Sequence, residues 1–175
     1  RSRRPLVLSG AGVSTRSGIP DFRGPQGVYR QVGGAHVFDL AVFQRDPALF
    51  FTHGRDLVYG AAEHTPSLVH TECARLEAAG RVAAVVTQNI DMLHQRAGSR
   101  RVIELHGSPA THTCQGCGRQ YGLGWARARV QAQGVPRCEA CGGVVKPDVT
   151  FFGEMLPAGA LEAAFAEAAA ADLTL

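Results

Sequence analysis

The chain has 175 residues, of which 45% are hydrophobic and 19% are charged, and its formal net charge is +3. This apolar content excludes a disordered chain, and the length fits one globular domain or one domain with a small insert. Basic residues cluster only at positions 1–4 and the longest apolar runs are far shorter than a membrane span. We therefore expect a cytoplasmic chain without a membrane partner or a direct nucleic-acid partner.

Strands and helices are predicted in alternation. Residues 6–8 form an apolar run that breaks into a glycine turn, which predicts a buried strand, and a long loop follows over 18–34. Asp46-Pro47 and Thr65-Pro66 each predict an N-cap and first turn of a helix. Further strands are expected at 82–86, 102–105, 149–152 and 173–175, and a further helix at 158–170. This alternation predicts an α/β fold in which a Rossmann-like parallel sheet has helices on both faces.

Two C-x-x-C pairs interrupt this pattern. Twenty residues separate the pairs, which is a zinc-ribbon spacing, and glycines beside each pair let backbone amides face the sulfur atoms. Four thiolates leave no open position, so we predict one structural Zn²⁺ ion rather than a catalytic one. The predicted metal ligands are Cys114, Cys117, Cys138 and Cys141. We place this zinc-binding module at 109–144, inserted into a Rossmann-like domain of 1–108 and 145–175, and expect the fifth cysteine, Cys73, in the core.

Polar or glycine-rich turns follow three of the expected strands. Backbone amides of residues 10–12 can approach a phosphate, aided by a following helix N-terminus, although a simple tight turn also explains these residues. Residues 87–91 lie at the carboxyl end of a parallel strand, where ligands bind, or form a capping turn. His106 precedes a glycine and could act as a general base, or be a surface residue. The other histidines are expected on the surface: His36, His53, His64, His70, His94 and His112.

Five motifs, in this order and over essentially the whole chain, resemble the sirtuin family. They are Gly10-Ala-Gly-Val-Ser-Thr-Arg-Ser-Gly-Ile-Pro-Asp-Phe-Arg-Gly24, Thr87-Gln-Asn-Ile-Asp91, Leu105-His-Gly107, the paired C-x-x-C knuckles, and Lys146-Pro-Asp-Val-Thr-Phe-Phe-Gly-Glu154. Residues 88–107, with Met92-Leu-His-Gln-Arg-Ala-Gly98 inside, are most similar to bacterial and archaeal members. The resemblance implies NAD-dependent removal of acyl groups from acetylated protein lysine, with NAD bound by the Rossmann-like domain.

The resemblance also implies residue roles. His106 would be the general base and Asn89 a second catalytic residue. The residues implied to bind NAD are Gly10, Ala11, Gly12, Phe22, Arg23, Gln88, Asn89, Ile90 and Asp91. The residues implied to pair with the substrate backbone by β-augmentation are Val149, Thr150, Phe151, Phe152, Gly153 and Glu154.

The implied reaction transfers the acyl group to ADP-ribose. The acyl-lysine oxygen attacks the anomeric carbon of the ribose, nicotinamide leaves, and His106 then activates a ribose hydroxyl. The products are lysine, nicotinamide and 2'-O-acyl-ADP-ribose. Sirtuins that prefer acidic acyl groups carry Tyr and Arg where this chain has Gly54 and Leu57, so we expect a neutral acyl group such as acetyl to be preferred over succinyl.

Two other functions stay open at this point. A mono-ADP-ribosyltransferase would use the same NAD site with a different nucleophile, and a non-catalytic interaction module would keep the zinc but bind no NAD. The family's fold continues beyond the counterpart of Leu175. The resemblance therefore implies a C-terminally truncated chain with an incomplete sheet, which lacks one wall of the NAD site and one side of the peptide clamp.

Overall fold

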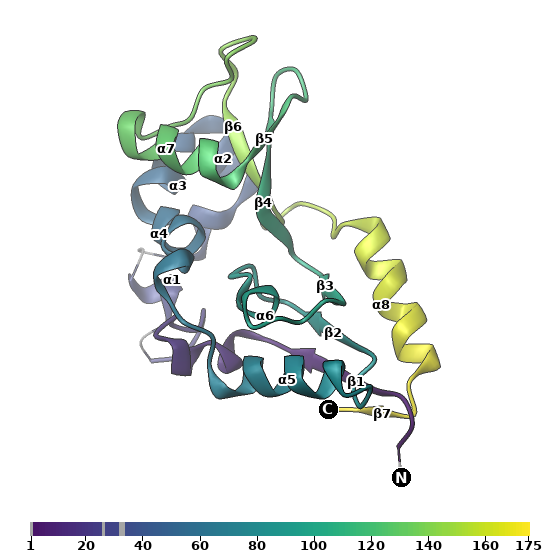
Figure 1. Cartoon of the computed structure of the whole chain (residues 1–175). Coiled ribbons are helices and arrows are strands. Elements are labelled where there is room, and N and C mark those ends of the chain that lie inside the picture. The colour runs from purple at the N-terminus through teal and green to yellow at the C-terminus, as the bar shows by residue number, and fades with distance from the viewer. Residues whose placement is uncertain (1, 26, 32–33) are drawn as a thin grey trace.

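A four-stranded parallel sheet forms one half of the protein in the computed structural model, which describes residues 2–25, 27–31 and 34–175 (Figure 1). The strand order is β3-β2-β1-β7. The strands are β1 (Pro5–Ser9), β2 (Ala84–Thr87), β3 (Val102–Glu104) and β7 (Leu173–Thr174). Ser9 pairs with Thr87 and Thr87 with Glu104, so three strands end at one edge. The expected parallel sheet is confirmed, and the strand expected at 82–86 begins two residues later.

Helices cover this sheet on both sides, as expected. Helix α8 (Ala158–Ala170) has the predicted bounds and packs on a buried cluster that contains Leu6 and Val86. Its Glu167 is 4% exposed and accepts a hydrogen bond from Arg4 at 2.8 Å and another from Arg101, which ties α8 to the starts of two strands. Helices α5 (Leu68–Ala78) and α6 (Leu93–Arg96) lie on the other side (Figure 1).

One predicted helix start is confirmed and the other is wrong. Asp46 caps α3 (Pro47–His53) because its carboxylate accepts a hydrogen bond from Ala48 N at 3.1 Å, and Gly54 then separates α3 from α4 (Arg55–Tyr59). Thr65-Pro66 does not begin α5. The N-cap of α5 is Ser67, whose backbone N–H donates to the Nδ1 atom of His70 at 3.1 Å. The side chain of His70 thus gives a partner to the backbone N–H at the start of the helix.

The second half of the protein contains a three-stranded antiparallel sheet of order β5-β4-β6. It consists of β4 (Gly107–Cys114), β5 (Gln120–Gly122) and β6 (Val145–Val149), and α7 (Leu123–Gln133) lies within the cysteine module. The strand expected at 149–152 is wrong because β6 ends at Val149. Beyond it, Phe152 forms only an isolated bridge with Asp39.

An aromatic core joins this sheet to the helices near residues 28–59. Helices α1 (Val28–Gln31) and α2 (Leu40–Arg45), with α3 and α4, share buried contacts with α7 and β6. Short 3-10 helices lie at Ala11–Val13, Thr15–Ser17, Ala35–Phe38 and Ala61–Glu63. This core groups helices α1 to α4 with the small sheet, whereas the expected division assigns them to the Rossmann-like domain; the domain division itself stays a prediction.

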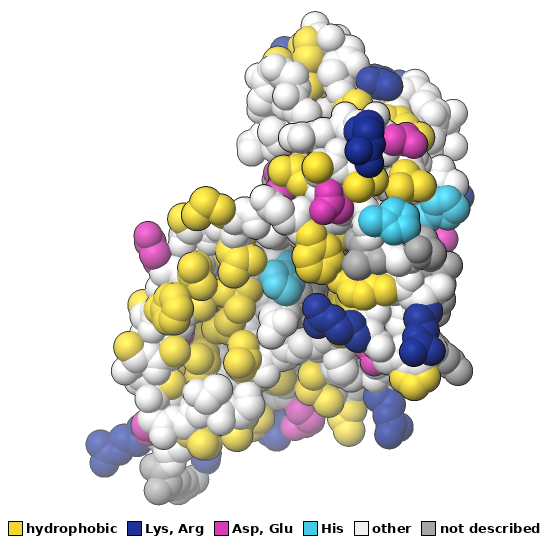
Figure 2. Space-filling view, turned by 180° about the vertical axis from the view of Figure 1, so that it is seen from behind, with side chains coloured by type: hydrophobic (Ala, Val, Ile, Leu, Met, Phe, Trp, Pro, Cys, Tyr) yellow, Lys and Arg dark blue, Asp and Glu magenta, His cyan; other side chains and the backbone are white. Residues whose placement is uncertain are grey.

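Apolar side chains gather on the lobe that carries α8 (Figure 2). Phe165 is 68% exposed there, and Leu173 and Leu175 beyond α8 are also exposed. Among the described residues, none of the helices has the length and hydropathy to cross a membrane.

Candidate active site and zinc centre

A cavity of about 600 Å³ lies at the carboxyl edge of the parallel sheet. Residues after β1, β2 and β3 form one wall, and the segment after β6 forms the other. Most of the predicted site residues meet here. Those that line it are Ala11, Phe22, Arg23, Gln88, Asn89, Ile90, His106, Val149, Thr150, Phe151, Phe152, Gly153 and Glu154, with Leu57 of the acyl-preference pair. Asp21, Gly24, Tyr29, Phe38 and Leu156 also line it, and the sequence indicates no individual role for them.

The glycine turn follows β1 directly. Gly10 has an extended backbone, and a Cβ atom on Gly10 or Gly12 would meet nothing within 4 Å, so the main chain there is open to a ligand. The helix N-terminus expected behind this turn is absent, because the 3-10 helix Ala11–Val13 has only three residues. Any phosphate bound here is therefore held by individual amides rather than by an α-helix dipole.

The hydroxyl of Ser14 connects the glycine turn to the segment after β2. It donates to Asp91 Oδ2 at 2.6 Å and accepts from Asn89 Nδ2 at 3.0 Å. Asp91 Oδ1 accepts from Leu93 N at 2.9 Å. These bonds fix the orientation of the Asn89 amide, and Asp91 lines a smaller recess beside the cavity with Ala11 and Phe22 among its neighbours. The lining of the recess is mostly apolar, with Ile19 and Leu57 among its residues, and includes the carboxylate of Asp91.

Three histidines expected on the surface are buried: His70 and His112 are 0% exposed and His94 is 1% exposed. His70 Nε2 lies 3.4 Å from Ser14 Oγ, and His94 Nε2 lies 2.9 Å from Ser9 Oγ. Burial lowers the pKa of both, that of His94 to about 4, so both are neutral at physiological pH. The expectation failed because their partners lie 56 and 85 residues away in the sequence.

His106 connects β3 to β4 and faces the cavity. Its Nδ1 atom lies 2.7 Å from the carbonyl oxygen of Gln88. A carbonyl only accepts hydrogen bonds, so Nδ1 carries the proton and Nε2 keeps its lone pair. The residue is therefore held in the tautomer that a general base needs.

Hydrogen bonds to other parts of the chain hold the segment after β6 in place. Thr150 N donates to His106 O and Phe152 N donates to Phe38 O, both at 2.8 Å. The Glu154 carboxylate turns inward, where Oε2 accepts from Phe151 N at 2.6 Å and from Lys146 Nζ at 2.9 Å. Burial lowers the pKa of Lys146. Lys146 belongs to the fifth motif, but its buried ion pair with Glu154 cannot be read from the sequence.

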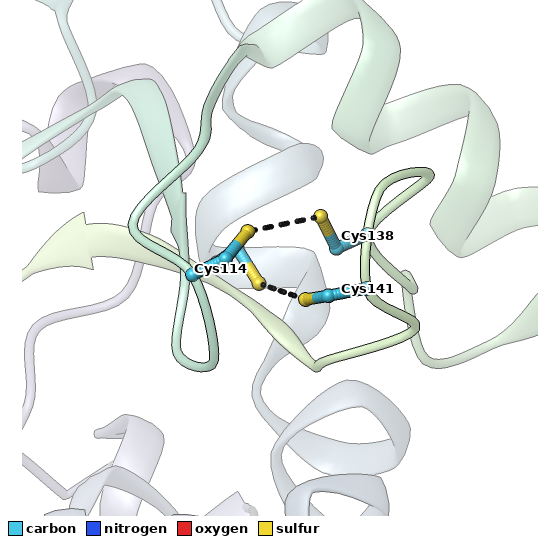
Figure 3. Close-up of side chains that lie close together, drawn as sticks. Cys114, Cys138 and Cys141 are labelled. Atoms are coloured by element: carbon cyan, nitrogen blue, oxygen red, sulfur yellow. Dashed lines mark hydrogen bonds between the residues drawn. The ribbon is translucent and has the colours of Figure 1, made fainter.

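The four predicted metal ligands converge at the end of the small sheet (Figure 3). Their sulfur atoms lie within 4.8 Å of one another, with Sγ–Sγ distances of 3.4 Å for Cys114 and Cys141 and 3.6 Å for Cys117 and Cys138. A tetrahedral Zn²⁺ with Zn–S bonds of about 2.3 Å places its sulfurs roughly 3.8 Å apart. The four cysteines therefore fit one structural zinc ion. Cys73 is buried on α5 as predicted.

Comparison with known proteins identifies the family. The Sir2 family profile matches residues 10–175. An NAD-dependent protein deacetylase of Thermotoga maritima is 41% identical over 174 residues, which is 99% of this chain and 70% of that protein. The NAD-dependent protein deacetylase 1 of Pyrobaculum aerophilum is 47% identical over 165 residues, which is 94% of this chain and 64% of that protein.

A solved structure supports the same family assignment. A Sir2 protein with a deacetylated p53 peptide and 3'-O-acetyl-ADP-ribose superposes with a TM-score of 0.93 at 40% identity, covering 99% of this chain and 70% of that one. The chain belongs to the Sir2 family, the sirtuins. The resemblance seen in the five sequence motifs is thereby confirmed.

Proposed function

We propose that the protein carrying these residues removes acetyl and other neutral acyl groups from protein lysine, with NAD as co-substrate. Its relatives are named NAD-dependent protein deacetylases, and a structural neighbour contains an acetyl-ADP-ribose. The observation that carries the proposal is His106: its Nδ1 is bound to Gln88 O, and it lines the same cavity as Asn89 and Phe22.

NAD, when bound, supplies the ribose carbon at which the acyl oxygen of the substrate displaces nicotinamide. The residues of this chain orient the ribose and the nicotinamide, and one of them accepts the proton of a ribose hydroxyl. Nε2 of His106 accepts the proton of a ribose hydroxyl, since its other nitrogen is committed to Gln88. Asn89, oriented by Ser14, positions the ribose, and Asp91 in the recess holds the nicotinamide amide. Phe22 packs on Tyr29 at 5.4 Å between ring centroids and keeps water from the reacting carbon.

The cavity favours a neutral acyl group. Leu57 lines both the cavity and the recess, and it offers no charge to a carboxylate. Gly54 cannot be replaced by a tyrosine without rearrangement, because even a Cβ atom there would lie 2.9 Å from Phe50 Cδ2. At these two positions a succinyl carboxylate would therefore find neither a phenol hydroxyl nor a guanidinium to offset the cost of desolvating it.

We place the reaction in the cytoplasm, where reducing conditions keep the four cysteine ligands available for zinc. The partners are proteins with acetylated lysine. Phe152 is 46% exposed and Phe151 is 2% exposed, so Phe152 offers the apolar contact for the lysine stem while Phe151 supports it from within the core.

An assay with an acetyl-lysine peptide tests the proposal. It uses the 175-residue chain and a longer protein that contains it, each with and without NAD, and detects the deacetylated peptide and 2'-O-acetyl-ADP-ribose by mass spectrometry. His106→Ala should abolish both products. ADP-ribose label retained on protein would instead indicate a mono-ADP-ribosyltransferase. A succinyl-lysine peptide that outruns the acetyl peptide would contradict the acyl preference.

A further inference from the structure

The second cysteine knuckle, residues 138–141, rests on three side chains that no zinc-binding motif includes. Tyr121 on β5 stacks on Trp125 of α7, with ring centroids 3.8 Å apart and an angle of 20° between the planes. The guanidinium of Arg129, one helical turn further along α7, lies 5.6 Å from the centre of the Trp125 ring. We call Tyr121, Trp125 and Arg129 the α7 platform.

The platform contacts Glu139, which lies between the two cysteines of this knuckle. Glu139 Oε1 accepts from Trp125 Nε1 at 3.0 Å and from Arg129 Nη2 at 2.7 Å. The backbone N–H of Glu139 donates to the hydroxyl of Tyr121 at 3.0 Å. Both the side chain and the backbone of Glu139 are thus hydrogen-bonded to the platform.

The direction of the remaining hydrogen bond follows from these contacts. The Tyr121 hydroxyl lies 3.1 Å from Cys138 Sγ. Since it already accepts from a backbone N–H, its single proton is free to point at the sulfur. A cysteine that ligates zinc is a thiolate without a proton, so it can only accept. Tyr121 is the donor and Cys138 the acceptor.

Because of this hydrogen bond, the sulfur of Cys138 has a partner that the other predicted zinc ligands lack among the described contacts. Cys114, Cys138 and Cys141 each lie 3.4 Å from a backbone N–H of their own knuckle: those of Gly116, Ala140 and Gly143. Among the described contacts, Cys138 alone also receives a side-chain hydroxyl. Four thiolates around Zn²⁺ leave a net charge of about −2, and a donor to a sulfur offsets part of it.

We propose that Tyr121 is a positioning residue of the zinc site, which retains the metal by donating a hydrogen bond to the Cys138 thiolate from the α7 platform. The two knuckles are joined through β5 and α7, so the inserted helix acts as a support for the site rather than as a spacer. Removing one residue that hydrogen-bonds to a metal ligand typically lowers metal affinity by about 10- to 100-fold.

The test measures zinc affinity of the 175-residue chain by competition with a chromogenic chelator at fixed pH. Tyr121→Phe keeps the stacked ring and removes only the hydroxyl, and it should weaken zinc binding about tenfold with unchanged circular dichroism. Tyr59→Phe removes a hydroxyl that lies 3.0 Å from His112 Nε2 instead of a sulfur, and it should leave the affinity within about twofold. Equal affinities for Tyr121→Phe and the parent, or an equal loss in both variants, would overturn the proposal.

Two further measurements separate the hydrogen bond from simple loss of structure. With Co²⁺ in place of zinc, Tyr121→Phe should move the sulfur-to-cobalt charge-transfer band to lower energy, because a thiolate without its donor gives up electron density more easily. Trp125→Phe keeps the Tyr121 hydroxyl and an aromatic ring beside it but removes the indole N–H that binds Glu139, so it should weaken zinc binding less than Tyr121→Phe. An unshifted band, or the reverse order of the two variants, would contradict a direct role of the hydroxyl.

Discussion

Lys146→Met tests whether a buried ammonium group fixes the segment that we expect to hold the substrate. Lys146 Nζ lies 2.8 Å from Val149 O, 3.2 Å from Pro147 O and 2.9 Å from Glu154 Oε2, and its side chain is 5% exposed. Methionine has a similar length and no charge, so a sulfur–aromatic contact replaces the ammonium over the Phe151 ring while three hydrogen bonds are lost.

The expected cost follows from the surroundings of the partner that remains. Removing one member of a fully buried ion pair costs about 3–5 kcal/mol. The Glu154 side chain is 25% exposed, so water can solvate it, and Phe151 N still donates to it at 2.6 Å. We therefore expect a loss of about 2 kcal/mol in the free energy of unfolding. For a chain of this length this corresponds to a fall of about 4–8 °C in Tm.

Thermal and urea unfolding followed by circular dichroism measure this loss. Glu154→Gln alone and the double variant complete a thermodynamic cycle, in which the double variant should cost less than the sum of the single ones. In a deacetylation assay, Lys146→Met should raise KM for the peptide more than it lowers kcat, since the cavity wall is displaced and His106 is not. A Tm within about 1 °C of the parent would refute the reasoning.

Two further predictions concern stability. Burial lowers the folded-state pKa of His94 from 6.5 to about 4, so the unfolded state binds more protons between these values. The free energy of unfolding, measured in urea, should therefore fall as the pH drops from 6.5 to 4, and His94→Asn should make this fall shallower; an unchanged slope would contradict it. Gly54→Ala should cost about 1–3 kcal/mol, because its Cβ would press on Phe50, whereas Gly124→Ala in α7 meets nothing within 4 Å and should cost nothing in the same melts. Equal melting temperatures for the two variants would argue against the steric explanation.

The sequence predicted those elements whose signals are local. Helix α8 is rich in alanine and begins just after a proline, so its bounds could be predicted to the residue. Strand β4 was missed because its sequence, Gly107–Cys114, contains Gly, Ser, Pro and Thr and no apolar alternation. It forms a strand because β6 pairs along one side and β5 along the other, and such tertiary support overrides local propensity.

The candidate site likewise contains residues that local sequence signals predict and residues that only the fold brings together. The zinc ligands could be predicted because the spacing of the four cysteines is a local sequence signal, and six of the nine residues implied to bind NAD line one cavity. The positions of Ser14, His70 and His94 could not be predicted. Their burial depends on partners from elsewhere in the fold, as Asp91 provides for Ser14 across 77 residues.

The position of His106 between the two sheets has a mechanical consequence. Its ring is anchored to the parallel-sheet half through Gln88 O, and its backbone carbonyl accepts from Thr150 N of the segment that follows the small sheet. His106 therefore links the two halves of the protein through its ring and its backbone. A shift of the small sheet would pull on the residue whose imidazole is hydrogen-bonded to the parallel-sheet half, so packing around β6 and the orientation of this ring depend on each other.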